Sequence, residues 1–261
     1  MKGLVKHKGQ KAAIQEIDLK HNENHVLIAV KIVGICRTDV KVYKGELCKC
    51  DKIVVGHEFS GIAQSGAFKG KLVSVNPMYK DKFMGLDFDG AICEFISVPE
   101  EYVYLTENLH PQSAAFLEPV AAALAVKPYL NGRCAVIGNN RIAKLVRMCC
   151  PEVEVFDESS LYDTLIETEH NDNYFRYLND NGRLVLKSRR DSNLSLNVND
   201  MVVRGLSVIG ASYSSFYDAV KWLENNDDVF ELFGNIYPMS EHETAFNVAQ
   251  QEEKKVFICV A

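Results

Sequence analysis

The sequence predicts an α/β protein in which a β-rich domain is interrupted by a unit of alternating strands and helices. Short β-branched runs separated by Gly, Asn and Asp fill the first third of the chain. Apolar strands then alternate with helical stretches, and a strand-like run closes the chain. A β-rich part on both sides of an alternating part is typical of a split domain around an inserted one. We therefore predict two domains, residues 1–120 with 238–261, and residues 121–237.

The individual elements follow from local composition. Alanine and leucine dominate residues 114–130 and predict a helix. Pro151 stops a second helix, and the pair Asn181-Gly182 predicts a turn. The predicted strands are residues 25–33, 52–55, 71–75, 91–98, 133–138, 153–156, 164–166, 183–187, 202–211 and 255–260, and the other helices are residues 141–150 and 215–224.

Composition excludes several classes of protein. The 261 residues are 47% hydrophobic and 25% charged, with a net charge of −6, a pI of 5.7 and no basic stripe, so nucleic acid is not an expected partner. We expect no membrane partner, because no run reaches the roughly 18 uninterrupted apolar residues of a membrane span. Eight cysteines without a signal peptide predict reduced thiols and a cytoplasmic location.

Three short stretches bring together the chemistry of a metal site. Residues 34–39 read GICRTD, residues 55–61 read VGHEFSG, and residues 116–120 read FLEPV. They supply a thiolate, an imidazole and several carboxylates, which is the ligand set of a catalytic zinc site. The pair His57-Glu58 alone is more typical of a polar turn between strands, but the combination predicts zinc.

The order and wording of these stretches resemble the zinc-dependent medium-chain dehydrogenases, the family of alcohol, sorbitol and threonine dehydrogenases. The resemblance covers nearly the whole chain, with large pieces missing. It implies that residues 1–120 with 238–261 form a GroES-like catalytic domain that binds zinc. It also implies that residues 121–237 form a shortened Rossmann-like, parallel-sheet, nucleotide-binding domain.

The resemblance also implies a role for each polar residue of the three stretches. Cys36 and His57 would ligate zinc, and Glu58 or Glu118 would be the fourth ligand at rest. Glu58, Thr38 and Asp39 would be catalytic: Thr38 would pass the substrate proton, and Asp39 would orient the imidazole. Lys41 replaces a proton-relaying histidine of many members, and a surface lysine is the favoured interpretation.

A second, structural zinc is not expected. Many family members carry four cysteines in a lobe that corresponds to residues 74–89, and no cysteine is present there. Cys48 and Cys50 form a CxC pair, but two ligands do not make a closed site. A loop with two free thiols is the favoured interpretation, and a metal-binding CxC is the alternative.

The cofactor fingerprint is altered. Residues 138–143 read GNNRIA where the pattern GxGxxG belongs. Gly138 is the first glycine, whereas Asn140 replaces the second, and we expect its side chain to occupy space that a pyrophosphate needs. Asp157 lies 19 residues after Gly138, where an acidic residue bonds the ribose hydroxyls of NAD. Arg37, by resemblance, is a candidate for the pyrophosphate. Arg141, at a helix start, is a second candidate, and a solvent-exposed helix residue is the equally weighted alternative for it.

The nucleotide-binding unit is also short. Only residues 158–162 separate two apparent strands after Asp157, whereas a parallel crossover needs about a dozen residues. Either the second strand is antiparallel, or a short connection passes beneath the sheet. Both possibilities reduce the adenine pocket, so we expect NAD binding to be weak, altered or lost.

Three hypotheses follow. The first is a minimal dehydrogenase that uses zinc and NAD on a small secondary alcohol of a polyol, sugar or amino acid. The second is a zinc lyase, dehydratase, epimerase or hydrolase that no longer binds NAD. The third, a non-catalytic remnant, conflicts with the retained ligand set. Residues 202–211 also resemble the strands through which relatives pair, which suggests a homo-oligomer; a buried core strand is the alternative.

Overall fold

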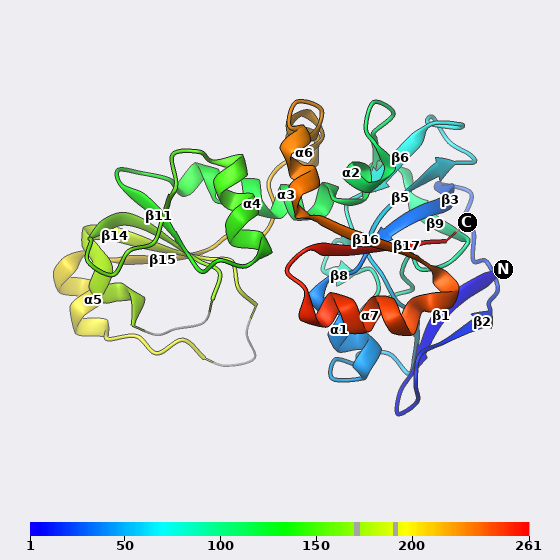
Figure 1. Ribbon diagram of the computed structural model, residues 1–261, viewed down its shortest axis with the longest axis horizontal. Coiled ribbons are helices and arrows are strands. Elements are labelled where there is room, and N and C mark those ends of the chain that lie inside the picture. The colour runs from blue at the N-terminus through cyan, green and yellow to red at the C-terminus, as the bar shows by residue number, and fades with distance from the viewer. Residues whose placement is uncertain (170–172, 190–192, 261) are drawn as a thin grey trace. The chain divides into compact units, whose positions relative to one another are not determined.

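The computed structural model describes residues 1–169, 173–189 and 193–260, and in it the chain forms two compact units (Figure 1). Unit 1 comprises Met1–Glu118 and Phe216–Ala261, and unit 2 comprises Pro119–Ser215. Unit 1 is therefore built from both ends of the chain, and unit 2 is the insertion between them.

Among the described residues, unit 1 contains the largest sheet and two smaller ones. A seven-stranded sheet runs in the order β10-β6-β5-β3-β17-β16, with β9 paired to β3, and a three-stranded sheet runs in the order β2-β1-β4. The strands are β1 (Lys2–His7), β2 (Ala13–Glu16), β3 (His25–Gly34), β4 (Lys52–Val54), β5 (Glu58–Ala63), β6 (Leu72–Val75), β9 (Phe95–Pro99), β10 (Val103–Leu105), β16 (Phe233–Pro238) and β17 (Lys255–Cys259), together with the hairpin of β7 (Met78–Tyr79) and β8 (Lys82–Phe83).

The apolar pattern of the sequence explains this sheet. In β3, the side chains of Val26, Ile28 and Val30 alternate into the core, and each is at most 1% exposed. The last strand, β17, pairs antiparallel with β3 and so returns the C-terminal segment to the first third of the chain. This confirms the predicted return of the C-terminal strand to the β-rich part.

The helices of unit 1 are short. They are α1 (Arg37–Lys44), α2 (Pro111–Ala115), α6 (Phe216–Leu223) and α7 (His242–Gln251), and α3 (Leu117–Leu124) crosses the boundary to unit 2. The helix predicted over residues 114–130 is in fact divided, because Phe116 leaves the helical conformation as the C-cap of α2 and α3 begins only at Leu117. None of the helices in the described ranges is long and apolar enough to cross a membrane.

Unit 2 contains one parallel sheet in the order β12-β11-β13-β14-β15. Its strands are β11 (Cys134–Ile137), β12 (Glu154–Val155), β13 (Tyr162–Glu167), β14 (Leu178–Leu186) and β15 (Ser207–Gly210), and its further helices are α4 (Arg141–Cys149) and α5 (Val198–Arg204). This confirms the expected α/β fold with a shortened parallel-sheet domain.

The sheet order settles how the short crossover runs. Because β12 and β13 pair with β11 on opposite sides and both are parallel to it, the antiparallel alternative is excluded. The connection leaves β12 and passes β11 within six residues, 156–161. It contains no helix, and the hydroxyl of Tyr162 accepts a hydrogen bond from the backbone N–H of Asp157 at 3.0 Å.

Two predictions within unit 2 were wrong. The β-branched start of residues 202–211 belongs to α5, because Gly205 adopts a left-handed conformation (φ 63°) and caps the helix by bonding Met201 and Val202. The strand begins only at Ser207. The predicted turn at Asn181-Gly182 lies inside β14, where it forms an irregularity in the pairing with β13.

Candidate active site

The strand-to-helix turn after β3 positions the first candidate ligand. Cys36 is the N-cap of α1, and its half-buried thiol lies at the helix start. His57 lies directly before β5 and is 2% exposed. Gly56 lets the segment before His57 pack closely against β3, because it adopts φ 101° and a Cβ there would lie 3.1 Å from Val33 and 2.7 Å from Ile92.

The structure brings three predicted ligands together. One ligand atom from each of Cys36, His57 and Glu58 lies within 4.8 Å of the others. A thiolate, an imidazole and a carboxylate are donors that zinc accepts in an open catalytic site. The side chains of His57 and Glu58 are both 2% exposed, so these two candidate ligands are shielded from solvent, whereas Cys36 is half-buried.

Asp39 holds two of these ligands in place with one carboxylate. Its Oδ1 accepts the Nδ1–H of His57 at 2.9 Å, and its Oδ2 accepts the backbone N–H of Cys36 at 2.9 Å. The side chain is 1% exposed. Because Nδ1 of His57 is bonded to Asp39, Nε2 is the nitrogen available to a metal.

The electrostatics of His57 follow from this pair. Burial lowers the pKa of His57, but the charge and the hydrogen bond of Asp39 raise that pKa well above its ordinary value. The ring also packs edge-on against Phe83, with centroids 4.8 Å apart. These two contacts fix the orientation of the imidazole.

Glu58 has a buried cationic partner that the sequence analysis did not consider. The ammonium of Lys255, at the start of β17, donates to Oε2 of Glu58 and to the carbonyl of Ile35 at 3.3 Å. Burial raises the pKa of Glu58, and Lys255 opposes that rise. Gly34 makes room for the pair, because a Cβ there would lie 3.0 Å from Glu58 and 3.3 Å from Lys255.

The other residues assigned to the zinc site lie around this group. Glu118 is 9% exposed, and its charge contributes to the raised pKa of Glu58. It is outside the three-residue ligand group found among the described residues, so its role as a ligand stays a prediction. Thr38 is the second residue of α1 and is half-buried, while Arg37 forms an exposed ion pair with Glu253 at 2.9 Å.

All eight cysteines are free, including the CxC pair. Cys50 is half-buried, and its sulfur lies 3.6 Å from the carbonyls of Leu86 and Asp87. Neither Cys48 nor Cys50 belongs to a metal-ligand group within the described residues.

In unit 2, the turn between β11 and α4 carries the altered fingerprint. Gly138 adopts φ 97°, which favours glycine, and Asn140 is the N-cap of α4. The Oδ1 of Asn140 accepts the N–H of Ala143 at 3.1 Å, and its Nδ2 donates to the carbonyl and hydroxyl of Thr168. The side chain is 8% exposed. Its amide is therefore engaged by Thr168 and by the start of α4. The expectation that this side chain occupies space that a pyrophosphate needs stays a prediction.

The carboxylate of Glu169 lies against the loop between β11 and α4. Oε1 of Glu169 accepts the backbone N–H of Asn139 at 3.2 Å, and a Cβ on Gly138 would lie 2.6 Å from the same oxygen. The N-terminus of a helix attracts anions through its free N–H groups. Glu169 thus places a negative charge at the loop where a bound dinucleotide would place its negatively charged phosphates.

Asp157 follows the end of β12, as an acidic residue for ribose hydroxyls would. Hydrogen bonds from the backbone and hydroxyl of Ser159 lower the pKa of Asp157, so its carboxylate is ionised at neutral pH. Its side chain is exposed. Arg141 is the first residue of α4, two residues after the amide that Glu169 binds.

Comparison with known proteins identifies the β-rich part. Residues 22–108 match the alcohol dehydrogenase GroES-like domain. L-Threonine 3-dehydrogenase of Bacillus velezensis is 30% identical over 172 residues, which cover 53% of this chain and 50% of the relative. The ribulose-5-phosphate reductase of Streptococcus pneumoniae is 23% identical over 271 aligned positions, which cover 77% of this chain and 78% of the relative.

Residues 22–108 form an alcohol dehydrogenase GroES-like domain, and the chain as a whole is similar to the medium-chain alcohol dehydrogenase family. It spans about half the length of the threonine dehydrogenase that it matches. Solved structures of this family share its fold: 2R,3R-butanediol dehydrogenase of Bacillus subtilis has a TM-score of 0.86 at 20% identity, covering 100% of this chain and 99% of the other. Galactitol-1-phosphate dehydrogenase of Escherichia coli has a TM-score of 0.83 at 18% identity, covering 100% of both chains.

Sequence reasoning missed two charged residues of this dehydrogenase-like chain. Lys255 stands at the start of an apolar strand, where a single lysine looks like an ordinary strand end. The remaining signal was the return of that strand to β3, which places its first residues beside the metal ligands. Glu169 follows β13, and the carboxyl ends of β11 and β13 lie together because these strands are parallel neighbours.

Proposed function

We propose that this protein is a zinc-dependent oxidoreductase that transfers hydride between a secondary alcohol and NAD. The observation that carries the proposal is the group formed by the half-buried Cys36 and the buried His57 and Glu58, with Asp39 hydrogen-bonded to both Cys36 and His57. The names of its relatives, a threonine dehydrogenase and a ribulose-5-phosphate reductase, favour a polyol, sugar or amino alcohol as the substrate.

The donor set fits zinc, with Cys36, His57 and Glu58 as ligands and Glu118 as a further candidate. When bound, zinc would supply a Lewis acid that polarises a carbonyl and lowers the pKa of an alcohol. The chain itself prepares the ligands. Asp39 fixes the tautomer of His57, and Lys255 forms a buried ion pair with Glu58 that opposes the rise of its pKa on burial.

Proton transfer is assigned to the start of α1. Thr38 lies two residues after Cys36, and its hydroxyl would accept the substrate proton and pass it on. Lys41 occupies the position of the relaying histidine, one turn further along the same helix. An ammonium relays a proton only through water or with a lowered pKa, so we assign the relay beyond Thr38 to solvent.

The cofactor assignment rests on the loop before α4 and on Asp157. The ionised Asp157 would accept hydrogen bonds from ribose hydroxyls, which favours NAD over NADP. Gly138, Asn140, Arg141 and Arg37 are the candidates for the pyrophosphate. The carboxylate of Glu169 opposes a phosphate at the same amides, so we expect binding to be weak.

Calorimetric titration of NAD and NADH into the zinc-loaded protein tests the proposal, with metal content measured on the same sample. Saturable binding of NADH, with NADPH weaker, would support the dehydrogenase and direct the screen to polyols and amino alcohols. Stoichiometric zinc without binding up to millimolar NADH would overturn the redox assignment and leave a cofactor-independent zinc enzyme.

We also propose a homo-oligomer formed through β15 and α5. Strand β15 is at the edge of its sheet and pairs only with β14 among the described strands, which leaves a row of backbone groups open. On α5, Val198, Val202 and Val203 are 69–75% exposed. Sedimentation should show an oligomer that Val202→Lys weakens; a wild-type monomer at all concentrations would contradict it.

For location, the eight free thiols support a reducing compartment, and we propose the cytoplasm. Fractionation with an antibody against the chain tests this. Recovery of the protein in an oxidising compartment would contradict it.

A further inference from the structure

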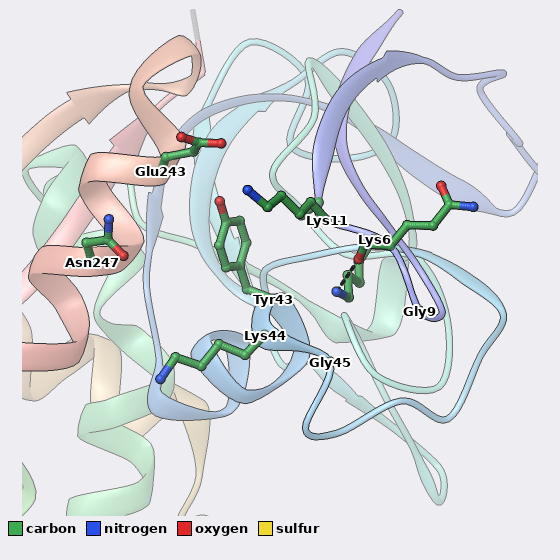
Figure 2. A pocket seen from close by; sticks show the side chains of 10 residues that line it. Lys6, Gly9, Lys11, Tyr43, Lys44, Gly45, Glu243 and Asn247 are labelled. Carbon is green, nitrogen blue, oxygen red and sulfur yellow. Dashed lines mark hydrogen bonds between the residues drawn. The ribbon is translucent and has the colours of Figure 1, made fainter.

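Unit 1 contains a pocket of about 510 Å³ at the C-terminal end of α1 (Figure 2). Four segments line it: strand β1, the turn between β1 and β2, the last turn of α1 and the first turns of α7. Its volume is within the range of pockets that hold small molecules. None of the residues assigned to the zinc site or to the cofactor lines it.

Basic side chains dominate this pocket. Lys6, Lys11 and Lys44 line it, against the single carboxylate of Glu243. Lys44 points away in Figure 2 and forms an exposed ion pair with Glu46 at 3.8 Å. Lys6 and Lys11 therefore supply the positive charge that faces the pocket, and they exceed the charge of Glu243 by one.

Lys6 is the unusual member, because its side chain is 5% exposed. Its ammonium donates to the carbonyl of Gln10 and lies beside Gly45, where a Cβ would be 3.2 Å from Nζ. The carbonyl and the C-terminus of α1 supply only partial negative charge. Among the described residues no carboxylate forms an ion pair with Lys6, although burying an uncompensated ammonium is costly.

The neutral and acidic lining is suited to hydroxyl groups. The hydroxyl of Tyr43 is hydrogen-bonded to Nδ1 of His242 at 3.0 Å, and its ring stacks on Phe246, so its position is fixed. Burial and the nearby Glu243 raise the pKa of Tyr43, which therefore keeps its proton. In Figure 2, Tyr43, Lys11 and Glu243 point toward one another across the pocket, and Asn247 lies beside them on α7.

We propose that this pocket binds a small phosphate ester that carries hydroxyl groups, with the ammonium of Lys6 as its buried anchor. Lysine binds phosphate as a point charge, and two of the three donors of Lys6 are not used by Gln10. Lys11 provides a second cation from the exposed turn. The carboxylate of Glu243 repels a bare anion but accepts hydrogen bonds from hydroxyls, so it favours an ester over inorganic phosphate.

Calorimetry at constant ionic strength tests this, with glycerol 3-phosphate, inorganic phosphate and glycerol as probes. We expect glycerol 3-phosphate to bind most tightly and glycerol not to bind. Lys6→Met should weaken binding at least about tenfold, as the loss of a hydrogen bond to a charged group does, and Lys11→Met about threefold. Lys8→Met is the matched control, because Lys8 is exposed in the same turn and does not line the pocket.

Equal affinity in Lys6→Met, Lys11→Met and Lys8→Met would overturn the proposal, as would the absence of saturable binding to the wild type. If Lys6→Met does not fold, the affinities of Lys11→Met and Lys8→Met for glycerol 3-phosphate are compared, since both positions are exposed. Weaker binding in Lys11→Met alone would then support the proposal. The readout is binding and does not depend on zinc, NAD or turnover. Its failure is therefore separate from a failure of the dehydrogenase assignment.

Discussion

The zinc site of unit 1 and the dinucleotide loop of unit 2 differ in how completely their polar groups are matched. At the zinc site, Asp39 bonds both His57 and the backbone of Cys36, and Lys255 neutralises Glu58. At the loop, the carboxylate of Glu169 lies at an amide that a cofactor phosphate would use. The connection after β12 contains no helix.

This difference separates two requirements of the proposed reaction. A catalytic metal needs a few donors at fixed distances, and one strand, one turn and one helix supply them here. A dinucleotide needs a long surface, so a deletion in the sheet domain weakens its binding while leaving the metal ligands intact. Three of the four predictions that follow test the contacts that hold the candidate zinc ligands. The fourth tests whether Glu169 weakens cofactor binding at the loop before α4.

Loss of a ligand should have the largest effect. Cys36→Ser and His57→Ala should strip zinc from the protein and abolish activity, because three ligand side chains are too few to spare one. Elemental analysis after dialysis measures the metal content. Cys48→Ser, outside the ligand group, is the control and should keep zinc. Stoichiometric zinc in either ligand variant would show that the assignment is wrong.

Removal of the buried ammonium should destabilise unit 1. Lys255→Met leaves the Glu58 carboxylate buried without its partner, which costs about 3–5 kcal/mol when a buried pair is broken. Chemical denaturation of the zinc-free protein measures the change. The double variant Glu58→Gln with Lys255→Met should recover most of the loss. No recovery would mean that Lys255 acts through packing and not through its charge.

Asp39→Asn should keep the shape of the site but lower its affinity for zinc. The amide cannot accept the two hydrogen bonds to His57 and Cys36 as a carboxylate does, and changes of this kind lower metal affinity about 10- to 100-fold. Competition with a chelator measures the zinc affinity. An unchanged affinity would remove Asp39 from the metal site.

The smallest effect is expected at the dinucleotide loop. Glu169→Gln removes the negative charge at the start of α4 and should tighten NADH binding about two- to fivefold, the size of a charge effect at a helix N-terminus. Glu152→Gln, exposed just after the same helix, is the control. Weaker binding in Glu169→Gln would show that Glu169 supports the loop and does not oppose the cofactor.

Local sequence features determined the elements with strong patterns. The alternation in β3 is readable because burial on one face imposes a period of two on the sequence. The end of α4 is readable because proline cannot continue a helix, and β17 is readable as a short continuous apolar run. Residues 202–204 show the limit, since β-branched side chains favour a strand but Gly205 ends a helix there. In such a short segment, the conformational propensities of the residues alone do not decide between helix and strand.

For the candidate site, the sequence by itself was enough to predict the candidate ligands Cys36, His57 and Glu58 and the orienting Asp39, because these residues lie in two short motifs. Only the tertiary structure decided the partners from distant segments. Lys255 reaches Glu58 through the pairing of β17 with β3, and Glu169 reaches Gly138 because β13 runs parallel to β11. Charges separated by many residues become neighbours through strand register, and register depends on the packing of the whole sheet.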